Sequence, residues 1–342
     1  QRTATVLLPK DYLRYRMTGK KVSDMSDAAG TLWLDVAKRD WSDSLLDKCG
    51  LARSQMPTLV EGCEVSATLD PQVAERWGLN PSVAVAGGGG DNAVSAIGVG
   101  AVSPGDAFIS LGTSGVLFVV TDAYRPAPQS AVHAFCHVLP NLWHQMSVML
   151  SAASCLQWFC RLTGTTEVAL LEEIAQLSEE EKAHAPFFLP YLSGERTPHN
   201  DPDARGMFWG MTHSSLRAQL GYAVLEGVSF GINDGLRVLK ESGTRIEQCS
   251  LVGGGARSPF WAQLLADILD MPVVTHKGGE TGGALGAARL ACLAAGKPLA
   301  AVCEKPEVWQ TWRADPARHQ TLMQRYAQFN SLYLNDLNYR KH

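Results

Sequence analysis

The segment at positions 249–275, CSLVGGGARSPFWAQLLADILDMPVVT, constrains the fold of this chain most strongly. An apolar strand pattern, a glycine turn, a helical pattern and a second apolar strand pattern follow one another in the order of a βαβ unit. Ser258 and Pro259 are favourable residues for the N-cap and the first position of the helix. Four apolar residues then recur at helical spacing: Trp261, Leu264, Leu265 and Ile268. The segment therefore predicts an α/β domain.

The glycine turn of this segment lies where the predicted helix begins. The free backbone N–H groups and the dipole of a helix N-terminus favour an anion or a polar ligand near Gly254 and Gly255. The spacing is not GxGxxG followed by an acidic residue about 20 positions later, so a dinucleotide site is not supported. Close backbone packing explains the glycines equally well, and both interpretations stay open.

A second glycine turn joins two β-rich runs in FISLGTSGVLFVV, residues 108–120, which predicts a β-hairpin. Gly112 and Gly115 allow a ligand to approach the backbone, and Thr113 and Ser114 place hydroxyl groups beside a row of N–H donors. This combination suits phosphate oxygens. An ordinary hairpin turn accounts for the same residues.

A third glycine turn, in GGGGDNAVSAIGVG at 87–100, carries a carboxylate in an otherwise apolar run. A buried, unpaired carboxylate is costly, so we expect Asp91 to be solvated, partnered or used in chemistry. Asp91 follows a predicted strand at 82–86, and catalytic groups of open α/β sheets often lie just beyond strand ends. Asp91 and Asn92 are thus a candidate catalytic set, although Asp91 also suits the cap of a helix that starts at Ala93.

Two helical patterns have structural explanations. The pattern at 216–236 places Glu226 near an apolar face, where a packing or capping role is favoured over catalysis. In ETGGALGAARLA, residues 280–291, one helical face carries the small residues Gly282, Gly286 and Ala287, which permits close helix packing without a ligand.

Two polar segments are weaker candidates for sites. The run GERTPHNDPDARG at 194–206 either closes over a site or forms a solvated loop braced by Glu195 and Arg196. His133 and His137 could share a metal ion on a helix, but the alternation in AVHAFCHVL also suits a strand, where four residues span about 13 Å. We expect no metal site at these histidines.

Composition narrows the class of protein. With 342 residues, 46% of them hydrophobic and 19% charged, the chain is long enough for about two globular domains. The formal net charge is −4 and the densest charge run, EEEK at 179–182, is acidic, which gives no basis for a nucleic-acid partner.

No apolar run reaches the length of about 18 residues that a transmembrane helix needs, and the first residues lack the layout of a signal peptide. Eight scattered cysteines without a CxxC pair indicate thiols in a reducing compartment, so we expect a cytoplasmic location.

The pattern of the chain changes at the glycine run, where we place a domain boundary. Residues 1–86 mix a strand candidate at Val6–Leu8, a helix candidate after Pro9 and polar loops, and are too few and too rich in loops for a complete domain. Residues 87–342 alternate strands, glycine turns and long helices, as expected of one α/β domain.

Four segments follow one another along nearly the whole chain, in the following order: GGGGDN, LGTSG, GMFWGMTHSSLRAQLGYAVLE and LVGGGARS. Together they resemble the carbohydrate kinases of the FGGY family. The segment 206–226 fits the carboxy-side signature of that family throughout. Within the family, PKDYLRYRMTG and PYLSGERTPHNDPDARG are most similar to the bacterial members that phosphorylate D-xylulose at O5 with MgATP. The resemblance implies the α/β fold of actin-like ATPases, which is ribonuclease H-like and has two domains around a cleft.

The resemblance also implies roles for individual residues. Asp91 matches the general base that takes the proton from the sugar hydroxyl, and it would lie near Mg²⁺ through water, while Asn92 matches a sugar-side position. The remaining matches belong to the ATP side: Gly112 and Thr113 in the phosphate hairpin, Gly210 near the nucleotide, and Gly254, Gly255 and Ser258 in the adenosine segment.

The beginning of the chain departs from the family pattern. Members begin with a strand and a DxGT-type phosphate hairpin, so we expect this chain to lack the first ~140 residues. On this interpretation residues 1–86 are the end of the sugar-binding domain and 87–342 are the complete ATP-binding domain. We then expect poor activity of the chain alone, and self-association or a homodimer through an exposed edge. The alternatives are another FGGY sugar or polyol kinase, and a non-catalytic nucleotide-binding module.

Overall fold

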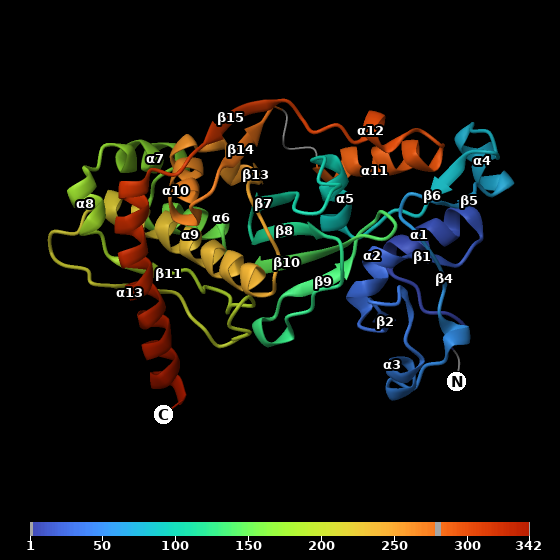
Figure 1. The fold of residues 1–342 in the computed structure, drawn as a ribbon, viewed down its shortest axis with the longest axis horizontal. Coiled ribbons are helices and arrows are strands. Elements are labelled where there is room, and N and C mark those ends of the chain that lie inside the picture. Colours follow the sequence, from blue (N-terminus) through green and yellow to red (C-terminus); the bar gives the residue numbers. More distant parts are fainter. Residues whose placement is uncertain (1–2, 278–281, 342) are drawn as a thin grey trace.

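The computed structural model describes residues 3–277 and 282–341, and its centre is a seven-stranded sheet (Figure 1). The strands run in the order β15-β14-β13-β7-β8-β10-β9. Strand β13 is parallel to its neighbours β14 and β7. The other neighbouring pairs are antiparallel: β15 with β14, β7 with β8, β8 with β10, and β10 with β9. The strand bounds are β7 Ala107–Leu111, β8 Gly115–Thr121, β9 His133–Cys136, β10 Trp143–Met149, β13 Cys249–Val252, β14 Val273–His276 and β15 Val308–Trp312.

Helices cover both faces of this sheet because consecutive strand residues point to opposite sides. Ile109 and Leu117 belong to a core shared with α6, α9 and α10, whereas Phe108 and Phe118 pack against α5. The helix bounds after the glycine run are α5 Asp91–Gly98, α6 Ala153–Thr163, α7 Glu167–Ala175, α8 Glu179–Ala183, α9 Arg217–Glu241, α10 Pro259–Leu269, α11 Gly282–Ala294, α12 Leu299–Val302 and α13 Pro316–Lys341. A two-stranded sheet, β11 Phe187–Leu189 with β12 Met207–Trp209, precedes α9.

The predicted βαβ unit and hairpin are both confirmed. Strands β13 and β14 are parallel and are joined by α10, which begins at Pro259. Ser258 is its N-cap, since the hydroxyl oxygen accepts the Trp261 N–H at 3.2 Å. The four apolar residues of the predicted stripe are buried. Strands β7 and β8 form the hairpin around residues 112–114.

The first part of the chain is a set of short elements that lies beside one edge of the large sheet (Figure 1). Their bounds are α1 Pro9–Thr18, β1 Val22–Asp24, α2 Met25–Ala28, β2 Leu34–Asp35, β3 Asp40–Trp41, α3 Asp43–Lys48, β4 Thr58–Val60, β5 Val65–Thr68, α4 Pro71–Trp77 and β6 Ala84–Ala86. Trp41 and Leu46 share a buried cluster with Cys136 of β9. The two parts of the chain are therefore joined by a common core.

One expected element is absent from this part. The predicted helix after Pro9 is confirmed, but the strand at Val6–Leu8 is wrong. A residue before proline is held extended, and Leu8 serves as the N-cap of α1, so the apolar run leads into the helix and not into a ladder.

Helices α5 and α11 pack closely through glycines, as the small residues of α11 predict. A Cβ atom on Gly286 would overlap the Val94 carbonyl, and one on Gly98 would overlap the Gly282 carbonyl. Ala287 is exposed, so it does not take part in the predicted face. Positions 280 and 281 of the predicted run lie outside the described residues.

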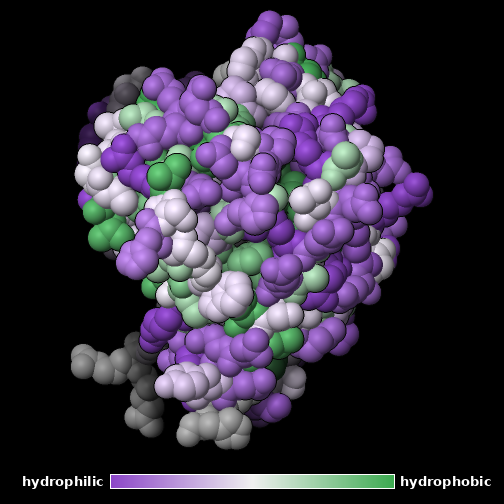
Figure 2. Space-filling model, turned by 90° about the vertical axis from the view of Figure 1, so that its left-hand side faces the viewer, coloured by the Kyte–Doolittle hydropathy of each residue, from purple (hydrophilic) through white to green (hydrophobic). Residues whose placement is uncertain are grey.

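The long helices are amphipathic and pack on the sheet or on one another. Within the described residues, none is both long and apolar enough to cross a membrane. The end of the molecule that carries α7, α8 and α13 has a mainly hydrophilic surface with scattered apolar side chains (Figure 2).

Candidate active site

Asp91 is the first residue of α5 and its side chain is exposed. Gly90 is the N-cap, so the alternative that Asp91 caps a helix starting at Ala93 is wrong. The Asp91 carboxylate accepts the backbone N–H of Asn92 at 2.7 Å and its side-chain amide at 3.1 Å. The structure therefore presents Asp91 and Asn92 together, at the start of a helix whose other end packs on the large sheet.

The glycine turn ahead of Asp91 is anchored to the first part of the chain. The Gly87 carbonyl accepts a hydrogen bond from the Arg14 guanidinium, and the Gly90 N–H donates to Ser26 Oγ at 3.0 Å. Asp91 thus follows a turn that side chains from the first part of the chain hold in place.

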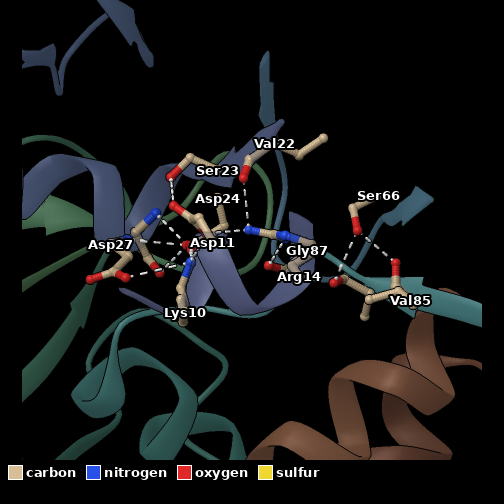
Figure 3. Close-up of polar contacts among 12 residues, drawn as sticks. Lys10, Asp11, Arg14, Val22, Ser23, Asp24, Asp27, Ser66, Val85 and Gly87 are labelled. Atoms are coloured by element: carbon tan, nitrogen blue, oxygen red, sulfur yellow. Dashed lines mark hydrogen bonds and ion pairs between the residues drawn. The ribbon is translucent and has the colours of Figure 1, made fainter. Parts of the chain in front are cut away.

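Behind this turn lies an ion cluster formed by Lys10, Asp11, Arg14 and Asp24 (Figure 3). Lys10 Nζ lies 2.6 Å from a carboxylate oxygen of Asp11 and 2.6 Å from one of Asp24. Burial opposes the charge of Lys10, but the two carboxylates outweigh it and raise its pKa. Burial also raises the pKa of the adjacent Asp27, against the attraction of Lys10 at 3.4 Å.

The other two glycine turns meet at the carboxyl ends of the neighbouring inner strands β7 and β13. Strand β13 pairs with β7 in parallel, with Val252 opposite Ser110, so the turn after β13 lies beside the hairpin after β7. Thr113 and Gly254 are exposed there. Gly255 is buried, and a Cβ atom on it would overlap the Leu111 side chain, so close packing alone requires this glycine.

The hairpin tip is held from behind by the start of α6. Ala152 and Ala153 donate backbone N–H bonds to the carbonyls of Thr113 and Gly112 at 2.9 and 2.8 Å. The Ser154 hydroxyl donates to the Thr113 carbonyl at 2.7 Å. The positions of Gly112 and Thr113 therefore depend on the segment that follows β10.

Glu195 braces the same segment, as one interpretation of the 194–206 run expected, but it does so as a buried group. Its carboxylate accepts the N–H groups of Leu150 at 2.9 Å and Arg196 at 2.7 Å, and only 3% of the residue is exposed. The solvated-loop interpretation of 194–206 is thus wrong at Glu195 and Thr197, which are buried against the end of β10. The run mixes charged and polar residues with Pro198, Pro202 and Ala204, and no periodic pattern in it signals the burial of Glu195.

Gly210 lies apart, between β12 and α9. It is exposed and has a φ of 84°, and a Cβ atom on it would meet nothing within 4 Å. The backbone conformation, and not crowding, therefore favours glycine here.

Glu226 is a packing partner, as predicted. It is buried in α9 and accepts two hydrogen bonds of 2.7 Å from the Arg325 guanidinium of α13. Burial raises the pKa of Glu226, and Arg325 opposes the shift. A cavity of about 410 Å³ lies beside this pair, between α8, α9, α10 and α13, and none of the predicted site residues lines it.

The exposed members of the predicted ATP side are compatible with a phosphate chain and its cation, whereas Gly255 and Ser258 are buried. Thr113, Gly210 and Gly254 are exposed, and Asp91 offers a carboxylate able to hold Mg²⁺ through water. No group of three His, Cys, Asp or Glu residues that could hold a metal directly is found in 3–277 and 282–341. His133 belongs to strand β9, in line with the alternation of its segment.

Models of the FGGY family of carbohydrate kinases match the chain in two places, the N-terminal domain at residues 1–98 and the C-terminal domain at 107–295. The chain belongs to the FGGY family of carbohydrate kinases. Since both domains are matched, the findings do not support the expectation that ~140 amino-terminal residues are missing.

This FGGY kinase is similar to proteins named xylulose kinase. It is 52% identical to that of Escherichia coli K12 over 330 residues, which are 96% of this chain and 68% of the relative. It is 54% identical to that of Klebsiella pneumoniae over 289 residues, 84% of this chain and 59% of the relative. A solved structure from Brucella ovis named xyloylose kinase superposes with a TM-score of 0.93 at 48% identity, covering 98% of this chain and 69% of that one. The chain thus spans about 59 to 69% of the length of these relatives, and its actin-like kinase fold agrees with the sequence prediction.

Proposed function

We propose that the protein transfers the γ-phosphoryl group of MgATP to O5 of D-xylulose, with Asp91 as the general base. The observation that carries this proposal is the exposed carboxylate at the first residue of α5, directly after an anchored glycine turn. The names of the similar proteins support the choice of sugar.

In this mechanism Asp91 aligns the attacking hydroxyl of the sugar and accepts its proton, and Asn92 contacts the sugar beside it. Gly112 and Thr113 bind phosphate oxygens at the hairpin, and the exposed Gly210 and Gly254 contact the nucleotide. Gly255 and Ser258, the other members of the predicted adenosine segment, are buried and shape that segment by close packing and by capping α10. When bound, Mg²⁺ neutralises the charge of the phosphates. Positioning and charge neutralisation are most of what phosphoryl transfer requires, so one carboxylate is sufficient as base.

D-xylulose-dependent release of ADP with MgATP tests the proposal. We expect Asp91→Ala to lower kcat by about 10²–10⁴-fold, because the proton acceptor is lost. Asp43→Ala is the matched control, since Asp43 is also an exposed first residue of a helix and lies in α3. Equal kcat values for the two variants would contradict the role of Asp91.

The same assay separates the alternatives. Faster turnover of another ketose or a polyol would assign a different sugar kinase of the family. ATP binding that survives Asp91→Ala, without turnover in the parent chain, would favour a nucleotide-binding module. The expectation of poor activity for this chain stays a prediction, which a rate close to that of a xylulose kinase of the family would contradict.

A further inference from the structure

The backbone of the glycine turn ahead of Asp91 is held at both ends by side chains from the first part of the chain. Arg14 donates to the Gly87 carbonyl at one end, and Ser26 Oγ accepts the Gly90 N–H at the other. These partners are 73 and 64 residues away in sequence. Figure 3 shows Arg14 reaching Gly87 beside the ion cluster.

The Ser26 hydroxyl has a fixed orientation. Its hydrogen is donated to Asp24, so a lone pair is left to accept the Gly90 N–H. Asp24 is itself immobilised, because it is fully buried, pairs with Lys10 and caps α2 by accepting the N–H groups of Ser26 and Asp27. A continuous set of contacts therefore connects the ion cluster to the residue before Asp91.

The turn has little room to move on its own. A Cβ atom on Gly89 would overlap Val138, so this side of the turn is packed against the segment after β9. Gly90 is the N-cap of α5, and any displacement of Gly90 moves the first helical residue, Asp91. A general base must stay within hydrogen-bond reach of the proton that it accepts, and small misplacements are costly.

We propose that Ser26, oriented by Asp24 of the ion cluster, is a positioning residue that sets the place of Asp91. It acts through the Gly90 N–H and does not touch the substrate. The proposal rests on the proposed role of Asp91 as the base.

Ser23 provides a matched control in the same cluster. It is buried like Ser26, with 1% of the residue exposed against 4%. Its hydroxyl donates to Asp11 at 2.6 Å and, among the described residues, makes no hydrogen bond to the glycine turn. Replacing Ser23 removes a buried hydroxyl beside the ion cluster and leaves the Gly90 anchor untouched, and Asp11 keeps its contacts with Lys10 and Arg14.

The test compares Ser26→Ala, Ser26→Thr and Ser23→Ala in the full chain by two measurements. Steady-state kinetics with D-xylulose and MgATP should show that Ser26→Ala lowers kcat by about 10–100-fold, as removing a supporting partner of a site residue does. KM for sugar and for ATP should change by less than about threefold, because a misplaced Asp91 slows the chemical step and leaves substrate binding nearly unchanged. Ser26→Thr keeps the hydroxyl and should retain most of the rate, and Ser23→Ala should stay close to the parent.

Hydrogen exchange of the peptide at 87–98 gives a readout that does not depend on turnover. Ser26→Ala leaves the Gly90 N–H without its acceptor, so exchange there should accelerate about tenfold, while Ser23→Ala leaves it unchanged. If the two alanine variants behave alike in kcat and in exchange, the proposal is overturned. If the parent shows no sugar-dependent turnover, the proposed function fails for this chain. Exchange then decides on its own whether Ser26 holds the turn.

Discussion

Glu195 is a buried carboxyl group whose titration should be visible in the stability of the protein. Burial raises its pKa from 4.5 to about 7, against the two backbone N–H bonds that favour the charged form. The folded state therefore holds this proton more tightly than the unfolded chain, and the free energy of unfolding should fall as the pH rises from about 4.5 to about 7. We predict that Glu195→Gln removes this contribution, which is at most about 3 kcal/mol.

Urea unfolding at about pH 5 and about pH 7.5 measures the effect, as the difference between the two unfolding free energies. Asp234 contributes in the same direction, because burial raises its pKa to about 6, so the variant should flatten the pH dependence without abolishing it. Glu172→Gln, an exposed position on α7, removes the same charge and should keep the parent's slope. An unchanged slope in Glu195→Gln would refute the assignment.

The contact between α5 and α11 shows how an element can depend on the absence of side chains. Gly286 faces the backbone of α5 at Val94, and a methyl group there has no space. Gly283 lies on the same helix, but a Cβ atom on it would only touch the Ser95 hydroxyl at 3.6 Å. We predict that Gly286→Ala destabilises the protein by about 1–3 kcal/mol through overpacking. Gly283→Ala should be neutral or stabilising by up to about 1 kcal/mol, because alanine is the better helix former.

Thermal unfolding of the two glycine variants is the measurement. The comparison is internal, since both substitutions add one methyl group to the same helix. Equal melting temperatures would mean that α5 and α11 can separate without loss, in conflict with the close contact described above.

At the scale of the whole molecule, residues 1–86 and the large sheet behave as one body in this structure. Arg39 spans the junction, since it pairs with Glu61 at 2.6 Å and donates to the Leu142 carbonyl at 2.8 Å. A buried cluster that includes Trp41 and Cys136 crosses the same junction. We predict a single cooperative unfolding transition. We expect Arg39→Ala to lower the free energy of unfolding by roughly 2–4 kcal/mol, because Glu61 and the Leu142 carbonyl lose their partner.

Calorimetry checks this prediction directly. Arg53→Ala is the control, because its exposed ion pairs with Asp40 and Asp43 lie entirely within the first part and should contribute far less to stability than the Arg39 contacts. Two resolved transitions, with only one displaced by Arg39→Ala, would show that the parts unfold independently.

Local features of this protein followed from the sequence alone. Three of these features depend on residues within a few positions of one another: the Ser258 cap, the β-hairpin at 112–114, and the placement of Asp91 after a strand and a glycine turn. The βαβ unit is longer, but each of its strands and its helix has its own local pattern. Propensity, capping and hydrophobic period act over such distances, which is why these predictions were correct. The family resemblance supplied the roles proposed for these residues.

The tertiary structure alone decided which distant groups support them. Ser26 reaches Gly90 across 64 positions and Glu195 reaches Leu150 across 45, and neither residue carries a local signal of its partner. The burial of Ser26 depends on α2 packing beside β9, and that of Glu195 on its loop packing against the end of β10. Hydrophobic period and capping act over a few residues, so they carry no information on such distant contacts. The sequence of each turn therefore determined its local conformation. Only the packed fold determined which side chains hold each turn in place.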